Sequence, residues 1–181
     1  MADDAERWLA GLTAVPGAGL LDDSSQRLVG EWAAQIRTVP SSDIATLIDA
    51  ARRLVAKHGW AQGQYGWPES GFSVVGAVEW AAHVSGWLQQ RAYRAERAAV
   101  LVLRVALAVR GEGDNLSAWN DDLRRQPEEI EVLLAEARVL TERIGGGVMR
   151  DCLHRWTPLG PGEECSRCGS YRQPPHPRSV R

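Results

Sequence analysis

The chain has 181 residues, of which 44% are hydrophobic, and a formal net charge of -2, so it can form one domain with a genuine core plus a small appendage. This charge gives no overall attraction to nucleic acid or to an anionic membrane surface. The first residues are acidic rather than basic, and no run approaches the roughly 18 apolar residues of a membrane span, so we expect a cytoplasmic protein with no membrane contact.

The first part of the chain shows three amphipathic helical patterns. Apolar residues recur at helical spacing over residues 5–12, over residues 24–37 and over residues 42–58. The boundary signals of the third pattern are Pro40 before it, Ser41 or Ser42 as its cap and Gly59 at its end. These patterns predict helices that each bury one face.

Residues 60–72 have the composition of a loop but contain several aromatic side chains. Trp60, Tyr65, Trp67 and Phe72 lie among glycines and one proline. One interpretation is that they cover the end of the helical core. The other is an exposed recognition surface, since tryptophan and tyrosine are enriched where proteins bind partners. The sequence leaves both open, and Trp60, Tyr65 and Trp67 are therefore candidate partner-binding residues.

The next two patterns predict a helix from Ser73 through Trp87 and a more hydrophobic helix over residues 91–110. The second is apolar nearly all round, so we expect it at the centre of the fold. Trp80, His83 and Trp87 share a face of the first. A lone histidine among tryptophans is more often a packed residue than a catalytic one, so His83 is not predicted as a site.

Two further patterns complete a helical body. Residues 115–122 form a short capped turn, in which Asp121 and Asp122 point in different directions and do not make a carboxylate pair. Pro127 then begins the last helix, which ends at the glycines 145–147. The predicted fold is therefore mainly α, a helical bundle over residues 1–147 followed by a small carboxyl-terminal knuckle.

All three cysteines lie in one short stretch near the carboxyl end. Cys152 and His154 form a C-x-H pair, and Cys165 and Cys168 form a C-x-x-C pair followed by Gly169. Three thiolates and one imidazole are the ligand set of a closed, tetrahedral structural zinc site. We therefore predict that residues 148–172 bind Zn²⁺ and that the ion has no open position for catalysis.

The number and spacing of the cysteines disfavour three other uses. An odd cysteine count without a signal peptide disfavours a disulfide framework, although a reversible Cys165–Cys168 bridge stays open. A c-type haem site needs histidine directly after Cys168, where the chain has Gly169. An iron–sulfur cluster usually takes four thiolates, and the chain has three.

The carboxyl-terminal region is basic, whereas the rest of the chain is acidic. Its arginines and aromatic residues are candidates for contact with a partner: Arg150, Arg155, Trp156, Arg167, Tyr171 and Arg172. Residues 173–181 are polar and rich in proline, so we expect a disordered tail.

Landmarks between Leu47 and Ala137 resemble an actinobacterial and actinophage domain family of unknown function. The landmarks are Leu47-Ile48-Asp49-Ala50-Ala51, then His58-Gly59-Trp60-Ala61-Gln62-Gly63, an alanine-rich helix near Ala77–Ala82, and Leu116-Ser117-Ala118-Trp119-Asn120-Asp121 before a glutamate-rich closing helix. The resemblance implies such an origin and a helical fold, and it implies no active site.

These observations favour a non-enzymatic interaction or adaptor protein that contains structural zinc and binds a protein partner or a second copy of itself. A nucleic-acid-binding regulator is the alternative, with the arginines of the zinc segment against phosphates and Trp156 or Tyr171 against bases. An enzyme with an unrecognised site is a further alternative, because the sequence has no phosphate loop or nucleophile motif.

Overall fold

The computed structural model describes residues 23–145, 156–159, 162–165 and 171–172. The helix predicted over residues 5–12 lies outside them. The first described helix, α2 (Asp23–Ile36), buries the predicted stripe, with Val29, Trp32 and Ile36 in the core. In the described part of the chain, helices supply most of the structure, and this confirms the mainly α prediction.

Helix α3 (Ser41–His58) follows Pro40 directly. The prediction that Ser41 or Ser42 caps it is wrong, because no side chain caps this end. The Pro40 carbonyl instead accepts the backbone N–H groups of Asp43 and Ile44, and the fixed φ of proline orients it for this. Gly59, with φ of 89°, ends the helix as predicted.

The segment predicted as a plain loop contains a small hairpin. Strands β1 (Gly66–Trp67) and β2 (Gly71–Phe72) pair antiparallel. A parallel bridge between Trp60 and Phe72 ties the hairpin back to the residue after α3. The strands are only two residues long, so they leave almost no alternating pattern in the sequence.

Helix α4 (Val74–His83) ends earlier than predicted. Ser73, where the helix was expected to begin, caps its start, because its hydroxyl accepts the backbone N–H of Gly76 at 3.0 Å. At the other end the Ser85 hydroxyl donates to the Ala82 carbonyl at 2.7 Å and accepts the Trp87 N–H at 3.1 Å. These local bonds compete with helix continuation, so Trp87 lies beyond the helix.

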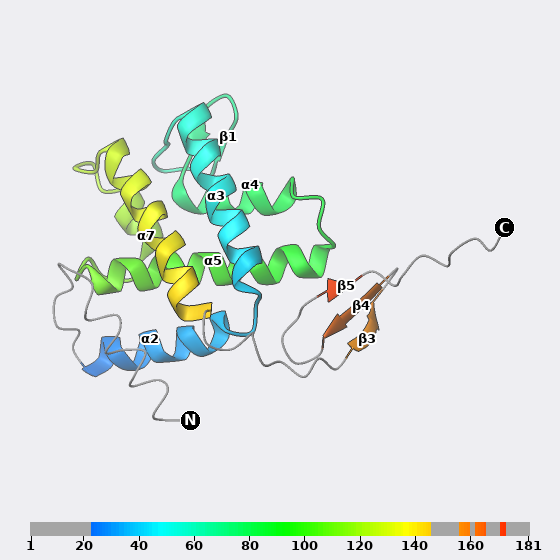
Figure 1. Cartoon of the computed structure of the whole chain (residues 1–181). Helices are drawn as coiled ribbons and strands as arrows, with labels where there is room; N and C mark the ends of the chain where they lie inside the picture. Colours follow the sequence, from blue (N-terminus) through cyan, green and yellow to red (C-terminus); the bar gives the residue numbers. More distant parts are fainter. Residues whose placement is uncertain (1–22, 146–155, 160–161, 166–170, 173–181) are drawn as a thin grey trace.

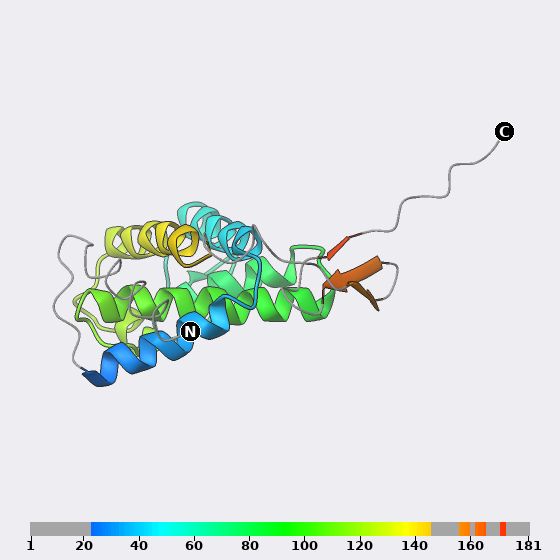
Figure 2. The same cartoon turned by 60° about the horizontal axis from the view of Figure 1, so that its bottom comes forward.

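Helix α5 (Gln89–Val109) is the long, largely buried helix predicted for the centre of the fold. Helices α3 and α7 lie side by side and cross it, while α2 packs on it from another side (Figures 1 and 2). Helix α4 contacts both α3 and α5. The core therefore lies where α5 meets these four helices.

The last two helices follow the predicted boundaries. The short helix α6 (Leu116–Asn120) is capped by the Asn115 side chain, which accepts the Ala118 N–H at 3.0 Å. Helix α7 (Pro127–Gly145) has proline at its first position and Glu128 and Glu129 in its first turn, where the helix dipole favours acidic residues.

The carboxyl-terminal region contains a separate three-stranded antiparallel sheet of β3 (Trp156–Leu159), β4 (Gly162–Cys165) and β5 (Tyr171–Arg172), in that order. Trp156 pairs with Cys165, and Glu164 pairs with Tyr171. None of the helices in the described residues has the length and apolar character needed to cross a bilayer.

Candidate functional site: an aromatic groove beside the hairpin

Asn120, at the end of α6, holds the loop after α3 in place. It is buried, and its carboxamide oxygen accepts the Trp60 indole N–H at 2.9 Å and the Val74 backbone N–H at 3.1 Å. Its amide group donates to the Ala61 carbonyl at 3.1 Å. One side chain thus joins the loop, the start of α4 and α6.

A second set of bonds strengthens this connection. The Gln62 side chain donates to the Asn120 and Asp122 carbonyls at 3.1 and 2.9 Å. The Asp121 carboxylate accepts the Gly63 N–H at 2.8 Å. We call Trp60, Gln62, Asn120 and Asp121 the Asn120 clamp. Because the clamp fixes the loop at both sides, the hairpin that follows has a defined position.

The hairpin packs directly on α4 at a glycine. A Cβ atom added to Gly76 would lie 1.8 Å from the Tyr65 carbonyl oxygen, so only glycine fits there. The Tyr65 carbonyl also accepts the Ser73 hydroxyl and backbone N–H. With its backbone held in this way, the hairpin exposes 65% of Tyr65 and 62% of Trp67.

The first hollow of the site lies between the hairpin and α4. It has a volume of about 700 Å³ and is lined by Tyr65 and Trp67 from the hairpin and by Glu79, Trp80 and His83 from α4. The rings of Trp67 and Trp80 meet edge to face, with centroids 5.6 Å apart. This end of the site offers flat apolar surfaces.

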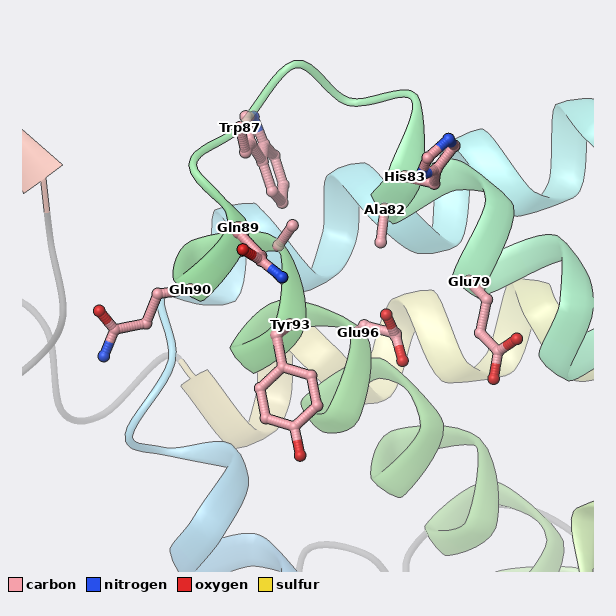
Figure 3. A pocket seen from close by; sticks show the side chains of 9 residues that line it. Glu79, Ala82, His83, Trp87, Gln89, Gln90, Tyr93 and Glu96 are labelled. Carbon is pink, nitrogen blue, oxygen red and sulfur yellow. The ribbon is translucent and has the colours of Figure 1, made fainter.

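A second hollow, of about 670 Å³, lies between α4 and the start of α5. Figure 3 shows Glu79 and His83 on α4, Tyr93 and Glu96 on α5, and Trp87 on the connecting segment, all around this hollow. Glu79 and His83 belong to both hollows. We call the combined site the aromatic groove, and α4 forms its middle.

The carboxylates of the groove are in an unfavourable environment. Burial, followed by repulsion from Glu96, raises the pKa of Glu79 above its ordinary value. Burial also raises the pKa of Glu96, against an opposing effect of Arg97. In the described part of the chain neither carboxylate forms an ion pair. A cationic ligand beside these carboxylates would favour their ionised forms and lower both pKa values.

The far end of the groove is anchored by an ion pair between the buried Asp43 and the partly exposed Arg91. Arg91 donates two hydrogen bonds to the buried Asp43 carboxylate, at 2.7 and 2.8 Å. The same guanidinium lies 4.5 Å from the centre of the Trp87 ring, close enough for a cation–π contact. This pair therefore fixes the Trp87 ring relative to α3 and α5.

The predicted partner-binding aromatics have different environments. Tyr65 and Trp67 are exposed in the groove, whereas Trp60 is partly buried in the Asn120 clamp. Phe72 is buried in the core, and its ring meets that of His58 with centroids 5.8 Å apart. The loop thus combines both interpretations of its aromatics, core cover and exposed surface.

Asp121 and Asp122 do not form a paired acid site. Asp121 serves the clamp, and Asp122 accepts hydrogen bonds from the backbone and side chain of Arg124, which lower its pKa.

Of the predicted zinc ligands, only Cys165 belongs to a described element, as the last residue of β4. Cys152, His154 and Cys168 lie outside the described residues, as do Arg150, Arg155 and Arg167. Trp156, Tyr171 and Arg172 belong to β3 and β5. Among the described residues, no group of three histidine, cysteine, aspartate or glutamate side chains could hold a metal ion.

Sequence reasoning missed most of the groove. Tyr93 and Glu96 carry no motif, and they meet Glu79 only because α4 and α5 pack together. The sequence places His83 on its helix face but predicts no site there. The available signal was the spacing of Glu79 and His83, four residues apart on one helix face.

Comparison with known proteins identifies a family but no function. Residues 39–139 match a family of unknown function, DUF6197. No curated protein matches the chain, and no solved structure matches it. The matched range contains the whole clamp and the whole groove.

Proposed function

Because the chain belongs to the DUF6197 family, which has no known function, we propose from its own residues that it is a non-enzymatic interaction or adaptor protein. The aromatic groove is the docking site for an extended segment of a protein partner. Residues 148–172 hold a structural Zn²⁺ through Cys152, His154, Cys165 and Cys168.

The observation that carries this proposal is the exposure of Tyr65 and Trp67 at the edge of an open hollow, with 65% and 62% of their surfaces open to solvent. The Asn120 clamp and the Gly76 contact hold the backbone of their loop rigidly. Rigid, exposed aromatics lose little entropy on binding and are frequent anchors in interfaces. Exposed apolar rings are unfavourable in water, and a partner that covers them would account for their exposure.

The charge of the groove favours a protein partner over nucleic acid. Glu79 and Glu96 line it without ion pairs in the described residues, and they would repel phosphate groups. A peptide that carries proline or other apolar groups together with arginine or lysine would match both the rings and the carboxylates.

The strand register supports the zinc proposal. Trp156 pairs with Cys165, and Glu164 pairs with Tyr171. His154 is two residues before Trp156, a reach of at most about 7 Å, and Cys168 is three residues after Cys165, at most about 11 Å. The two ligand pairs can therefore converge at one end of the sheet on an ion with bonds of about 2.0–2.3 Å.

Peptide titration tests the groove. Synthetic nine-residue peptides with proline and arginine, the same peptides with glutamate for arginine, and a 20-nucleotide single-stranded DNA are titrated into the full chain, with tryptophan fluorescence and calorimetry as readouts. We expect saturable binding of the arginine peptides, and a loss of about tenfold or more in Trp67→Ala. Val139→Ala, an exposed apolar residue of α7, is the matched control and should bind normally.

Two outcomes of this titration would overturn the groove proposal. One is the absence of binding by every peptide class, both to the full chain and to a chain that ends at Arg172. The other is binding of the DNA in preference to the peptides, with affinity that falls steeply as salt is raised, because that dependence is the mark of phosphate contacts.

A further inference from the structure

The chain carries a segment whose chemistry matches the aromatic groove. Residues 173–181 read Gln-Pro-Pro-His-Pro-Arg-Ser-Val-Arg, with three prolines, two arginines and no acidic residue. This segment lies outside the described residues. We propose that residues 173–181 are the intramolecular occupant of the aromatic groove. The inference rests on the proposed function of the groove and names its ligand.

The apolar part of the match is between prolines and rings. Proline-rich segments adopt the extended polyproline II conformation without help, and they dock against exposed aromatic side chains at a small entropic cost. The groove offers Tyr65 and Trp67 in its first hollow and Trp87 and Tyr93 in its second. Pro174, Pro175 and Pro177 supply rings of matching size.

The polar part of the match is between charges. Glu79 lines both hollows, Glu96 lines the second, and neither has an ion pair within the described residues. Arg178 and Arg181 follow the prolines closely, so both parts of the ligand are carried by one short peptide. Burial raises the pKa of both carboxylates, and Glu96 adds to the effect at Glu79. Two arginines beside them would favour the ionised forms and offset this cost.

The connection is long enough for the contact to form within one chain. Helix α7 ends at Gly145, and 27 residues separate it from Gln173. Even with the pairing of β3, β4 and β5 counted against this length, tens of ångströms of reach remain at about 3.3 Å per extended residue. A tethered segment also has an effective concentration near the millimolar range, so a weak contact is populated.

The test uses the full chain, a chain that ends at Arg172, and the free peptide Gln-Pro-Pro-His-Pro-Arg-Ser-Val-Arg. Nuclear magnetic resonance follows the indole N–H signals. We expect the signals of Trp67 and Trp87 to differ between the two chains, and addition of the peptide to the shortened chain to restore the full-length positions. The same peptide should bind the full chain at least about tenfold more weakly, because the tethered copy competes.

Substitutions identify the contacts. Glu79→Gln with Glu96→Gln should weaken peptide binding about fivefold, as expected for partly exposed ion pairs. A peptide with glutamine for Arg178 and Arg181 should lose binding by a similar factor, and Val139→Ala should have no effect. In the full chain, Arg178→Glu with Arg181→Glu should reproduce the spectrum of the shortened chain.

Two results would overturn the inference. One is that the Trp67 and Trp87 signals of the shortened chain equal those of the full chain and do not shift when the peptide is added up to about 1 mM. If the unrelated proline and arginine peptides still bind in a Trp67-dependent way, the groove proposal stands and only its occupant is wrong. The other is a full chain that sediments as a dimer and becomes monomeric on shortening, because the segment would then be exchanged between copies.

Discussion

Asn120 is the residue on which the position of the groove depends most. Its amide group donates to the Ala61 carbonyl and the Asp121 carboxylate, its carbonyl oxygen accepts from Trp60 and Val74, and it is 1% exposed. A buried amide with all its bonds made stabilises a structure, whereas one lost partner leaves a buried group without compensation. The same residue belongs to the Leu116–Asp121 landmark of the family resemblance, and Trp60 belongs to the His58–Gly63 landmark.

Asn120→Ala should therefore destabilise the protein by about 2–4 kcal/mol, because the Val74 N–H and Ala61 carbonyl lose their partner and a small cavity forms. Urea unfolding followed by circular dichroism measures this. Ser117→Ala, on an exposed position of the same helix, is the control and should stay within about 0.5 kcal/mol. Equal effects of the two substitutions would show that the clamp does not stabilise the fold.

Glu79 gives a pH-dependent prediction. Burial and the nearby Glu96 raise its pKa in the folded protein, so the folded state binds this proton more tightly than the unfolded state does. Ionisation of Glu79 therefore costs stability at neutral pH, and the cost disappears as pH falls below its ordinary range. In the chain that ends at Arg172, whose groove lacks the proposed arginines, we expect Glu79→Gln to raise the melting temperature slightly at pH 7, with the gain shrinking toward pH 4. A gain that grows on acidification would contradict this.

At the scale of elements, the contact between the hairpin and α4 is steric. The Tyr65 carbonyl lies where a side chain at position 76 would begin. Gly30 of α2 is a matched comparison, since a Cβ atom there would meet nothing within 4 Å. The two helical glycines have opposite roles, because one permits packing and the other only adds flexibility to the unfolded chain.

Gly76→Ala should destabilise the protein by about 1–3 kcal/mol and move the hairpin. Gly30→Ala should stabilise it by about 0.5–1 kcal/mol. Thermal unfolding compares the two variants in one experiment. Destabilisation by both, or by neither, would contradict the assigned roles.

Much of the element order could be predicted from sequence, and the exceptions have local causes. Helices α3, α5 and α7 have long apolar stripes with proline or glycine at their ends, so their periodicity was clear. The early end of α4 depends on two hydrogen bonds of the Ser85 hydroxyl. The groove could not be predicted, because Glu79 and Glu96 come together through helix packing that no spacing encodes.

At the scale of the whole molecule, we propose that the chain comprises a helical domain with its own core and a small sheet whose folding depends on Zn²⁺. The helical core draws on all the helices from α2 to α7. Residues 148–172, which contain the proposed zinc ligands, have few apolar side chains. The ion would therefore contribute most of the folding energy of this segment.

Metal removal should therefore affect one part only. Elemental analysis of purified protein should give one Zn²⁺ per chain, and a strong chelator should change the resonances of residues 150–172 while the helical circular dichroism keeps its melting temperature. Cys165→Ser should change the same resonances in the absence of chelator, again without a change in the melting temperature of the helices. Protein that contains no stoichiometric metal would refute the zinc proposal and leave the groove proposal intact.

The central claim is that the exposed rings of the groove are a binding surface, and chemical-shift mapping tests it most directly. Titration of a proline and arginine peptide into the protein that ends at Arg172 should shift the indole N–H signals of Trp67, Trp80 and Trp87 together with the Glu79 and Glu96 amides. The signals of α2 and of the exposed face of α7 should not move. Shifts that are absent, or that map to a surface away from α4 and the hairpin, would contradict the account.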